Sequence, residues 1–348
     1  MKATKTTITM QDIADKLNVS KALVSKALSN KPGVNVKTKE KIRLIAMEMG
    51  YSFNSSKSFV PDSQTGNMAV LLPRKFYEDL EYWGILLQGI EYELQKYDFS
   101  MMISTIDAES ADGLQLPICI ENRKVDGALI LGNIPLSIIT GVQTYGMPIV
   151  LVDSINFSSH FDHVLTQNFY GSYEAANFVL EKGFKRVAFV GDESFSWSFS
   201  ERLRGYKAAI AERTALPSKS VIESSVLTGI GGDYVNDEFE KKLLDVLKEG
   251  TQPCFVAAND PVALECIRIA ERNGFSCPAD FSIIGFDNIS KAQWNDLTTV
   301  DVDKKGIAQK AVELMIGRLR ETEGRTVQMM LSTEIIERKT VAFRKGQQ

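Results

Sequence analysis

The sequence predicts a small all-α head followed by a larger α/β body built of two lobes. A chain of 348 residues exceeds the usual size of one compact core, so two or three domains are expected. Residues 1–60 hold eleven Lys/Arg and four Asp/Glu, a net charge of +7, whereas the remainder carries −11. From Asn67 onward, apolar runs alternate with helical patterns, which is typical of βαβ units.

The composition, 44% hydrophobic and 24% charged, is ordinary for a soluble globular protein. No run of about 18 apolar residues suggests a membrane span, and the first residues lack the apolar segment of a secretory signal, so we expect a cytoplasmic protein. Wide cysteine spacing, with no C-x-x-C pair, favours buried free thiols over disulfides or a metal site. The cysteines are Cys119, Cys254, Cys266 and Cys277.

The head begins with a pattern for two short helices joined by a tight turn. Thr9 is suited to cap a helix over residues 10–17, and Asp12 stands at its third position, close to a capping box. Asn18 tolerates the left-handed geometry that ends a helix. Only two residues then precede Ser20, a fair N-cap for the second helix. Two short helices with so brief a connection are typical of a helix-turn-helix.

The second helix contains the pentad VSKAL twice, at residues 19–23 and 24–28. Five residues rotate a helix by about 500°, so the two copies do not face the same way. Leu23, Val24, Ala27 and Leu28 form an apolar face. Lys21, Ala22, Ser25 and Lys26 form a small, polar and basic face. A plain amphipathic surface helix would give the same pattern, so the neighbouring segments decide between the two interpretations.

A third helix over about residues 36–49, after Asn35 and before Gly50, would close a three-helix core. The polar face of the second helix would then be free to meet the major groove or its phosphates. A positively charged head suits a polyanionic partner. The interpretation as a DNA-binding helix-turn-helix is therefore favoured.

About fifty residues of this head resemble the lactose/galactose repressor (LacI/GalR) family of bacterial transcription regulators. The matching residues are Asp12-Ile13-Ala14, Val19-Ser20, Val24-Ser25, Leu28, Pro32-Gly33-Val34, Gly50-Tyr51 and Asn54. The resemblance places Lys21 and Ala22 at the main base-reading positions, and Lys26 where the family usually has an arginine. We expect DNA contacts from Thr9, Ser20, Lys21, Ala22, Ser25, Lys26, Asn30, Tyr51, Asn54, Lys57 and Val60.

The segment after Asn54 departs from the family, in which a short hinge helix inserts a leucine into the minor groove. Here Lys57 replaces the usual alanine and Val60 the leucine, with Phe59 just before it. Either apolar residue could act as a wedge between base pairs. Pro61 would end a helix, so a flexible linker is the alternative in the DNA-free protein.

Seven apolar runs of the body are typical of buried parallel strands. They are MAVLLP, FSMMIS, GALILG, PIVLVD, RVAFVGD, CFVAAND and SIIGFDN. Helical patterns lie between them, for example at residues 79–97, 170–183 and 200–214. The expected division is a head at 1–54, a linker at 55–66 and a body at 67–345. The expected lobes are about 67–164 plus 296–325, and about 165–295 plus 326–345.

Polar and aromatic residues near the predicted strand ends suggest a ligand cleft, since open α/β sheets bind ligands there. The candidates at the strand ends are Arg74, Tyr82, Trp83, Asp153, Asn259 and Asp287, and Arg202 lies on the first helix of the second lobe. Any one of them could instead be a cap or turn residue. The body resembles the same repressor family and its periplasmic sugar-binding relatives over nearly its whole length, as in DGALILG, SERLRGY and SIIGFDNISKAQWNDLTTV.

The resemblance implies a periplasmic-binding-protein-like fold. It also implies that Tyr82, Trp83, Asp153, Arg202, Tyr234 and Asp287 line an effector cleft. The two arginines would suit an anionic sugar. The acids and aromatic rings would suit a neutral or amino-bearing sugar, which we favour.

Other motifs point away from catalysis. The HFDH run at residues 160–163 lacks an evident third ligand, so we expect a solvated loop there rather than zinc. GIGGD at 229–233 lacks the spacing of a phosphate-binding loop, and no G-x-S-x-G elbow occurs. We therefore expect no enzyme, no cofactor and no metal.

The predicted function is repression of a carbohydrate-related operon by a homodimer that binds a near-palindromic operator under the control of a sugar-like effector. The tail after IIERKTVAF has no leucine heptads, which favours a dimer over a tetramer. A sugar-binding transport protein and an enzyme on the same body remain alternatives. The sequence leaves open the effector, induction or co-repression, the operator, the target genes and the state of the hinge.

Overall fold

The structure is a computed structural model. It describes residues 9–28, 34–35, 38–39, 41–42, 45–46, 49, 65–107, 115–154, 161–215, 223–232, 234–321 and 324–343. The chain divides into two compact units, Met1–Phe59 and Val60–Gln348. The boundary falls inside the segment for which the sequence predicts a linker.

Capping residues fix the two complete helices of the head. These helices are α1 (Met10–Leu17) and α2 (Lys21–Leu28). Thr9 and Asp12 form a capping box, in which the Thr9 N–H donates to the Asp12 carboxylate at 2.6 Å. Asn18 ends α1 in the left-handed conformation, with φ 52°. The Leu23 N–H donates to Ser20 Oγ at 3.1 Å, so Ser20 caps α2 as predicted.

The head has its own small core. Its members are at most 1% exposed and come from α1, α2 and the segment of the predicted third helix: Ile13, Ala14, Val24, Ala27, Ile42 and Ala46. The described residues 38–39, 41–42 and 45–46 of that third segment are helical. On α2, Lys21, Ala22 and Lys26 are exposed and Ser25 is half-buried, which confirms the predicted polar face.

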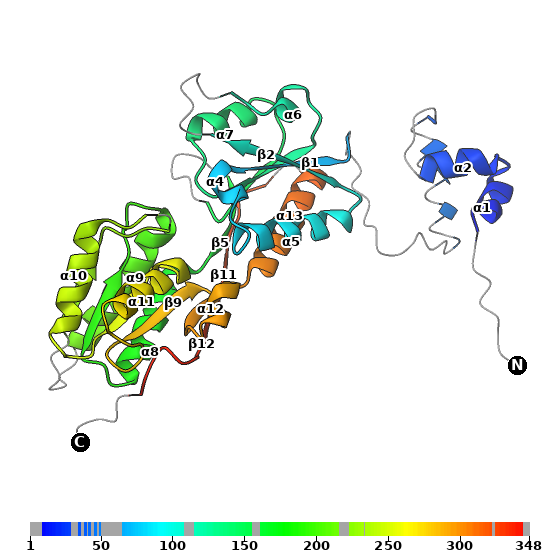
Figure 1. Ribbon diagram of the computed structural model, residues 1–348. Coiled ribbons are helices and arrows are strands. Elements are labelled where there is room, and N and C mark those ends of the chain that lie inside the picture. Colours follow the sequence, from blue (N-terminus) through cyan, green and yellow to red (C-terminus); the bar gives the residue numbers. More distant parts are fainter. Residues whose placement is uncertain are drawn as a thin grey trace, which may run out of the picture. The chain divides into compact units, whose positions relative to one another are not determined.

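Among the described residues, the body forms two six-stranded sheets, one in each lobe (Figure 1). The first sheet has the order β11-β5-β4-β3-β1-β2 and is parallel throughout. Its strands are β1 (Asn67–Pro73), β2 (Ser100–Ile106), β3 (Gly127–Leu131), β4 (Ile149–Val152), β5 (Asp162–Thr166) and β11 (Gln328–Leu331).

The second sheet has the order β12-β10-β9-β8-β6-β7 and is parallel except for the antiparallel edge strand β12. Its strands are β6 (Arg186–Val190), β7 (Glu223–Leu227), β8 (Cys254–Ala257), β9 (Ser282–Asp287), β10 (Thr299–Val302) and β12 (Thr333–Ile336).

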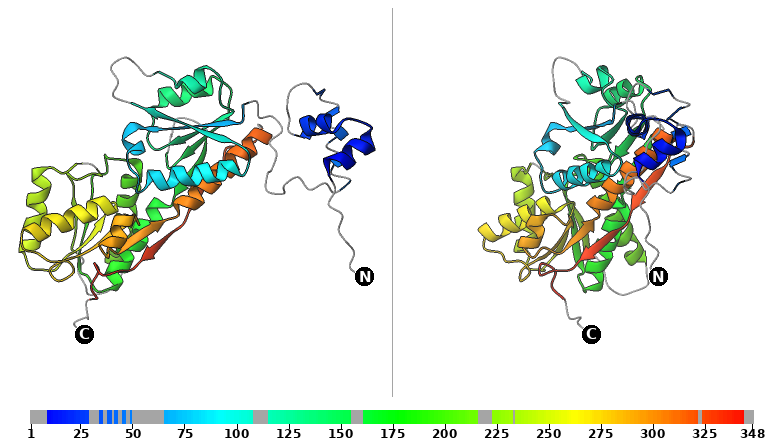
Figure 2. Two further views of the ribbon diagram at one scale, coloured as in Figure 1. Left: turned by 45° about the vertical axis from the view of Figure 1, so that its right-hand side comes forward. Right: turned by 90° about the vertical axis from the view of Figure 1, so that its right-hand side faces the viewer.

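Helices cover both faces of the first sheet, and strand residues alternate between them. Met68, Val70 and Leu72 pack in the cluster that contains α5 and α13, which lie side by side (Figure 2). Ala69 and Leu71 pack in the cluster that contains α6 and α7. Burial on both faces explains why β1 (Asn67–Pro73) is apolar at each of its positions 68–72. The helices are α4 (Arg74–Tyr77), α5 (Trp83–Gln95), α6 (Ile118–Glu121), α7 (Leu136–Gln143) and α13 (Lys304–Arg320).

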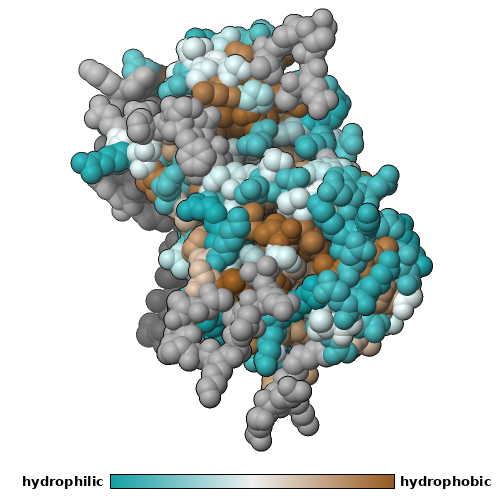
Figure 3. Space-filling view, turned by 90° about the vertical axis from the view of Figure 1, so that its left-hand side faces the viewer, coloured by the Kyte–Doolittle hydropathy of each residue, from teal (hydrophilic) through white to brown (hydrophobic). Residues whose placement is uncertain are grey.

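Five helices flank the second sheet: α8 (Asn168–Glu181), α9 (Trp197–Ala215), α10 (Asp237–Lys248), α11 (Asp260–Arg272) and α12 (Ser290–Trp294). Helices α8 and α9 approach each other closely at Gly205, where a side chain would not fit. A Cβ at this position would lie 2.0 Å from the Phe169 carbonyl oxygen. Seen from the side of α10, the body surface is mostly hydrophilic (Figure 3).

Three segments connect the lobes, and they correct two predicted boundaries. They run from β5 to α8, from β10 to α13, and from β11 to β12. The sequence predicted that residues 296–325 belong to the first lobe and 326–345 to the second. Instead β10 pairs in the second sheet, and β11 pairs in the first. The chain therefore crosses between the lobes only after each of these short strands has ended, at or next to the edge of its sheet.

The HFDH run is not a solvated loop where the structure describes it. Asp162 and His163 begin β5 and are 4% and 2% exposed. Arg318 donates to both carboxylate oxygens of Asp162, at 2.6 and 2.8 Å, and this pairing permits the burial of the acid. His160 lies outside the described residues.

Several other predictions concern single elements. The seven predicted strands all occur, although the helix predicted at 79–97 begins only at Trp83. The four cysteines, all in the described part of the chain, form no disulfide, and Cys119, Cys254 and Cys266 are buried as predicted. No helix in the part of the chain that the structure describes is long and apolar enough to cross a membrane.

Candidate functional site

Four of the eight predicted cleft residues meet between the lobes: Tyr82, Asp153, Arg202 and Asp287. The Tyr82 phenol donates to Asp153 Oδ2 at 2.8 Å. Asp153 follows β4 and Asp287 ends β9, so each sheet contributes one acid from a strand end. Both acids adopt positive φ, 48° and 102°. Such backbone conformations are uncommon for residues other than glycine and occur often at functional sites.

Arg202 of α9 holds the second-lobe part of this cluster together. It is 4% exposed, and its guanidinium donates through Nε to Asn168 Oδ1 at 2.9 Å. Nη1 donates to the Ala258 carbonyl at 2.6 Å, and Nη2 donates to Asp287 Oδ1 at 2.9 Å. The guanidinium carbon also lies 3.7 Å from the centroid of the Phe286 ring. The protein itself therefore occupies all three guanidinium nitrogens.

Lys304 is a member of the cluster that the sequence analysis missed. It is 6% exposed, and its ammonium donates to the main-chain carbonyls of Asp287 and Val302. The same nitrogen lies 5.4 Å from the centroid of the Tyr82 ring. Its position just after β10 could have identified it as a strand-end residue, but the sequence analysis did not predict this strand. The cluster thus contains two cations and two acids.

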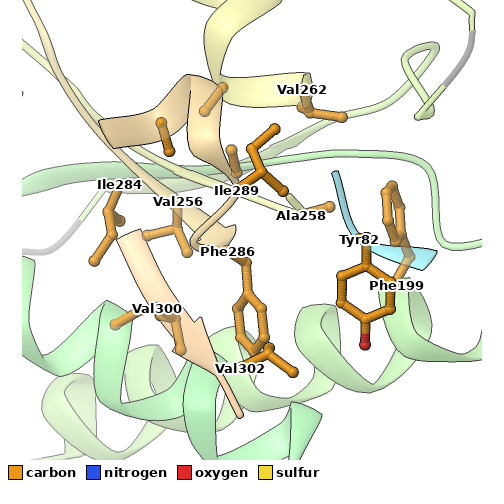
Figure 4. Close-up of a cluster of buried hydrophobic side chains, with 14 of the residues drawn as sticks. Tyr82, Phe199, Val256, Ala258, Val262, Ile284, Phe286, Ile289, Val300 and Val302 are labelled. Carbon is orange, nitrogen blue, oxygen red and sulfur yellow. The ribbon is translucent and has the colours of Figure 1, made fainter. Parts of the chain in front are cut away.

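Burial controls the protonation of this cluster. Tyr82 is 7% exposed and belongs to the apolar cluster of Phe199, Phe286 and Val302 (Figure 4). Burial, and next the negative charge of Asp153, raise the pKa of the Tyr82 phenol well above its usual value. The phenol therefore stays protonated and donates its hydrogen bond at neutral pH.

Asp260 lies behind the cluster and is fully buried. Thr299 Oγ1 donates to its Oδ1 at 2.5 Å, and the Ile289 N–H donates to its Oδ2 at 2.9 Å. Burial, together with the charge of Asp287, raises the pKa of Asp260 to about 7. Burial also raises the pKa of Asp287, against the opposing positive charges of Arg202 and Lys304.

One carboxylate oxygen of the cluster is unused. Asp153 Oδ1 is buried and accepts no hydrogen bond from any residue that the structure describes. Leaving a buried acceptor unpaired costs about 1–3 kcal/mol. A hydroxyl or amino group of a ligand could pair with it.

The remaining predicted cleft residues make no side-chain hydrogen bond to this cluster, although the Trp83 ring meets the Tyr82 ring edge-on with centroids 5.1 Å apart. Trp83 is buried and stacks on Phe76, with ring centroids 4.4 Å apart and planes at 8°. Arg74 is exposed at the first position of α4. Asn259 caps α11, since its side-chain oxygen accepts from the Val262 N–H at 3.0 Å. For Asn259 the structure shows the capping role that the sequence left as the alternative.

Tyr234 lies on the second lobe beside Phe195, outside the cluster of Tyr82, Asp153, Arg202 and Asp287. It is 40% exposed, and its hydroxyl donates to Asp192 Oδ2 at 2.9 Å. Its ring centroid lies 6.3 Å from that of Phe195. Lys75 of the first lobe places its ammonium 5.3 Å from the Phe195 ring, so this aromatic group also faces the other lobe.

The head presents the second candidate surface. Lys21, Ala22 and Lys26 are exposed on α2, whereas the Thr9 and Ser20 side chains cap helices. Five further predicted DNA contacts lie outside the described residues: Asn30, Tyr51, Asn54, Lys57 and Val60.

A helix-turn-helix head and a two-lobed α/β body with a polar cluster between its lobes define a DNA-binding regulator with an effector domain. Residues 9–54 match the family described as bacterial regulatory proteins of the lacI family. Residues 176–341 match the periplasmic binding protein-like domain. A lacI-family head joined to a periplasmic binding protein-like body is the make-up of a transcriptional regulator of the LacI type, a non-enzymatic family, with an effector domain.

Relatives match along the whole chain. The HTH-type transcriptional regulator MalR of Clostridium butyricum is 28% identical over 347 residues, which cover 94% of this chain and 98% of the relative. A LacI family regulator from Enterococcus faecium with bound ribose has a TM-score of 0.65 at 24% identity, covering 80% of this chain and all of that one. The lac repressor dimer bound to operator and the anti-inducer ONPF has a TM-score of 0.64 at 19% identity, covering 97% and 99%.

Proposed function

We propose that this regulator represses a carbohydrate-related operon, binds a near-palindromic operator as a homodimer, and responds to a small sugar-like effector. The effector binds between the lobes, beside Asp153, Arg202 and Asp287. The observation that carries the effector site is the buried, unpaired Asp153 Oδ1 in a cluster whose Tyr82, Arg202 and Asp287 side chains each make a hydrogen bond.

The proposed DNA surface is the polar face of α2. Lys21 and Ala22 reach base edges at the start of the helix, and Lys26 follows one turn later. Ser25, Thr9 and Ser20 contribute contacts near the backbone, and the charge of +7 over residues 1–60 supports binding to phosphates. The proposal includes the other predicted contacts, Asn30, Tyr51, Asn54, Lys57 and Val60.

The cluster favours a neutral or amino-bearing ligand over an anionic one. Each guanidinium nitrogen of Arg202 already donates to a protein acceptor, and the acids Asp153 and Asp287 lie in the same cluster, which disfavours a further negative charge there. Lys304 already donates to two carbonyls. The group left without a partner is an acceptor, Asp153 Oδ1, which suits a hydroxyl or amine. Bound ribose in the Enterococcus faecium structure is consistent with this class.

The proposed mechanism is linkage between the effector and the operator. Three crossings join the lobes, so a ligand that prefers one lobe orientation changes the population of that orientation. If operator binding prefers one orientation too, the effector changes operator affinity, and operator DNA changes effector affinity by the same factor.

A homodimer in the cytoplasm fits this function, because a near-palindromic operator matches a two-fold symmetric protein. The operator-bound lac repressor structure is a dimer. Sedimentation of the free protein should give twice the chain mass at micromolar concentration. A tetramer mass would overturn the homodimer.

The effector can be found by thermal unfolding of the full chain with neutral sugars, sugar phosphates, uronic acids, amino sugars and nucleobases. A ligand at a hundred times its dissociation constant stabilises the protein by about 2.7 kcal/mol. A stabilising sugar is then tested for its effect on operator binding, with Asp153→Asn as the variant and Asp98→Asn as the matched surface control. A sugar that binds tightly without changing operator affinity overturns the linkage. A sugar that binds Asp153→Asn as well as the wild type overturns the site.

A further inference from the structure

A cavity of about 280 Å³ lies where the chain passes between the lobes. Residues 166–170 form one wall, at the end of β5 and the start of α8. Trp197, Glu201 and Arg204 of α9 form the second wall, and Met330 of β11 closes the cavity from the first sheet. It contains none of the predicted effector residues. It touches their cluster only through Asn168, which accepts a hydrogen bond from Arg202.

The start of α8 offers hydrogen-bond donors to this cavity. Gln167 stands at the N-cap position, and its side chain makes no capping hydrogen bond. The first intrahelical bond runs from the Gly171 N–H to the Gln167 carbonyl at 2.9 Å. The N–H groups of the preceding turn have no intrahelical acceptor. In contrast, α10 and α11 are capped by Asn236 and Asn259.

Thr166 provides an independent indication of a ligand. It lines the cavity and is 2% exposed. Its Oγ1 has no hydrogen-bond partner among the residues that the structure describes. A buried hydroxyl without a partner is unfavourable, and a bound carbonyl oxygen would satisfy it together with the first-turn N–H groups of α8.

The other wall determines the chemistry of the rest of the ligand. Trp197 supplies a flat apolar surface, which suits an aromatic ring. Arg204 pairs with Glu201, so the wall carries no net charge. The Glu201 side chain is only 17% exposed, and its carboxylate can accept a hydrogen bond from a ligand but would repel an anion.

We propose that this cavity binds a small, neutral, aromatic carboxamide or lactam. The ring lies against Trp197. The carbonyl oxygen accepts from the α8 first turn and the Thr166 hydroxyl, and the amide N–H donates to the Glu201 carboxylate. Each of the three chemical parts of the ligand thus has a matching protein group.

The test is calorimetric titration of the full chain with nicotinamide, supported by thermal unfolding. Gln167→Asp places a good cap at the start of α8, which competes for the same N–H groups. This variant should melt a few degrees higher than the wild type and bind nicotinamide at least about tenfold more weakly. A rise in stability with a loss of binding cannot come from misfolding.

Trp197→Leu tests the ring contact, with Trp294→Leu as the matched control, since Trp294 is 74% exposed on α12 and does not line the cavity. Nicotinamide binding should be lost in the first variant and kept in the second. Absence of saturable nicotinamide binding to the wild type overturns the proposal. So does unchanged binding in Gln167→Asp and Trp197→Leu, or tighter binding of nicotinate than of nicotinamide.

Discussion

Arg202 Nη2 donates to Asp287 Oδ1 at 2.9 Å, and this ion pair joins α9 to the end of β9. The two side chains are 4% and 10% exposed, whereas most ion pairs of the described body lie at the surface. A buried charge that loses its partner keeps its desolvation cost, so the pair should matter far more to stability than surface pairs do.

Replacing Arg202 should therefore be strongly destabilising. We expect Arg202→Met to lower the free energy of unfolding by about 3–5 kcal/mol, because Asp287 and Asn168 lose their donor inside the protein. Arg268→Met is the matched control, since Arg268 pairs with Glu265 at the surface. It should cost less than about 1 kcal/mol in urea unfolding. Equal costs for the two variants would show that the buried pair has no special role.

The Tyr82 hydroxyl should stabilise the protein through Asp153. Tyr82→Phe leaves both carboxylate oxygens of Asp153 without a donor, and we expect a loss of about 1–3 kcal/mol in urea unfolding. Tyr173→Phe is the control, because Tyr173 donates to Glu212 in an exposed hydrogen bond. Its removal should cost less than about 1 kcal/mol. If Tyr82→Phe costs no more than this control, the Asp153 contact contributes little.

Asp260 should make stability depend on pH. Its pKa is about 7 in the folded protein, against 3.8 for an unperturbed aspartate. Between these values the folded state binds a proton that the unfolded state has lost, so stability falls as pH rises from about 4 to about 7. The contribution should change by about 1 kcal/mol per pH unit in this window and stay constant above it.

Asp260→Asn removes this titration, and an asparagine can still accept from the Ile289 N–H while donating to the Thr299 hydroxyl. Urea unfolding of both proteins from about pH 4 to about pH 8 should show the variant gaining relative to the wild type as pH rises. Asp287 is kept in both proteins, but its charge acts on Asp260, so the pH-dependent difference reports the coupled titration of the two acids. A difference that does not vary with pH would contradict the raised pKa of Asp260.

The parts of the fold that the sequence could predict have local causes. Thr9, Asp12 and Ser20 cap the head helices within three residues of their hydrogen-bond partners. Among the seven predicted strands, β3 and β4 are apolar and buried at every position, so the apolar run alone marks them. In contrast, strands such as DHVLT and TVDV were missed because they bury polar residues. Asp162 pairs with Arg318 156 residues away, and no local pattern reveals such a partner.

In the candidate site, too, some residues could be predicted from local sequence and others could not. Asp153 and Asp287 could be found because they end recognisable strands. Lys304 was missed because it follows β10, which is short and contains two polar residues. Arg74 and Asn259 also stand next to strand ends, but one is exposed and the other caps a helix. Position beside a strand end is thus not sufficient to place a residue in the cluster. Nor is it necessary, because Tyr82 precedes α5 and Arg202 lies within α9.

Lys26 offers a test of the proposed DNA surface. It is exposed on α2 at a position where the resemblance to the family implies arginine. A lysine ammonium donates as a point charge, whereas a guanidinium can pair with both O6 and N7 of guanine. Lys26→Arg should therefore sharpen the preference for guanine at one operator position by about 1–3 kcal/mol, measured by selection from a randomised operator library.

Lys16→Arg is the matched control, because Lys16 is exposed in the last turn of α1 and is not among the predicted base contacts. It should leave base preference unchanged, since any contact it makes with DNA would be to phosphate, where lysine and arginine both act through charge. If Lys26→Arg changes affinity equally for all operators, Lys26 contacts only the backbone. In that case Lys26→Ala should reduce the salt dependence of binding by about one charge, and base reading on α2 would rest on Lys21 and Ala22.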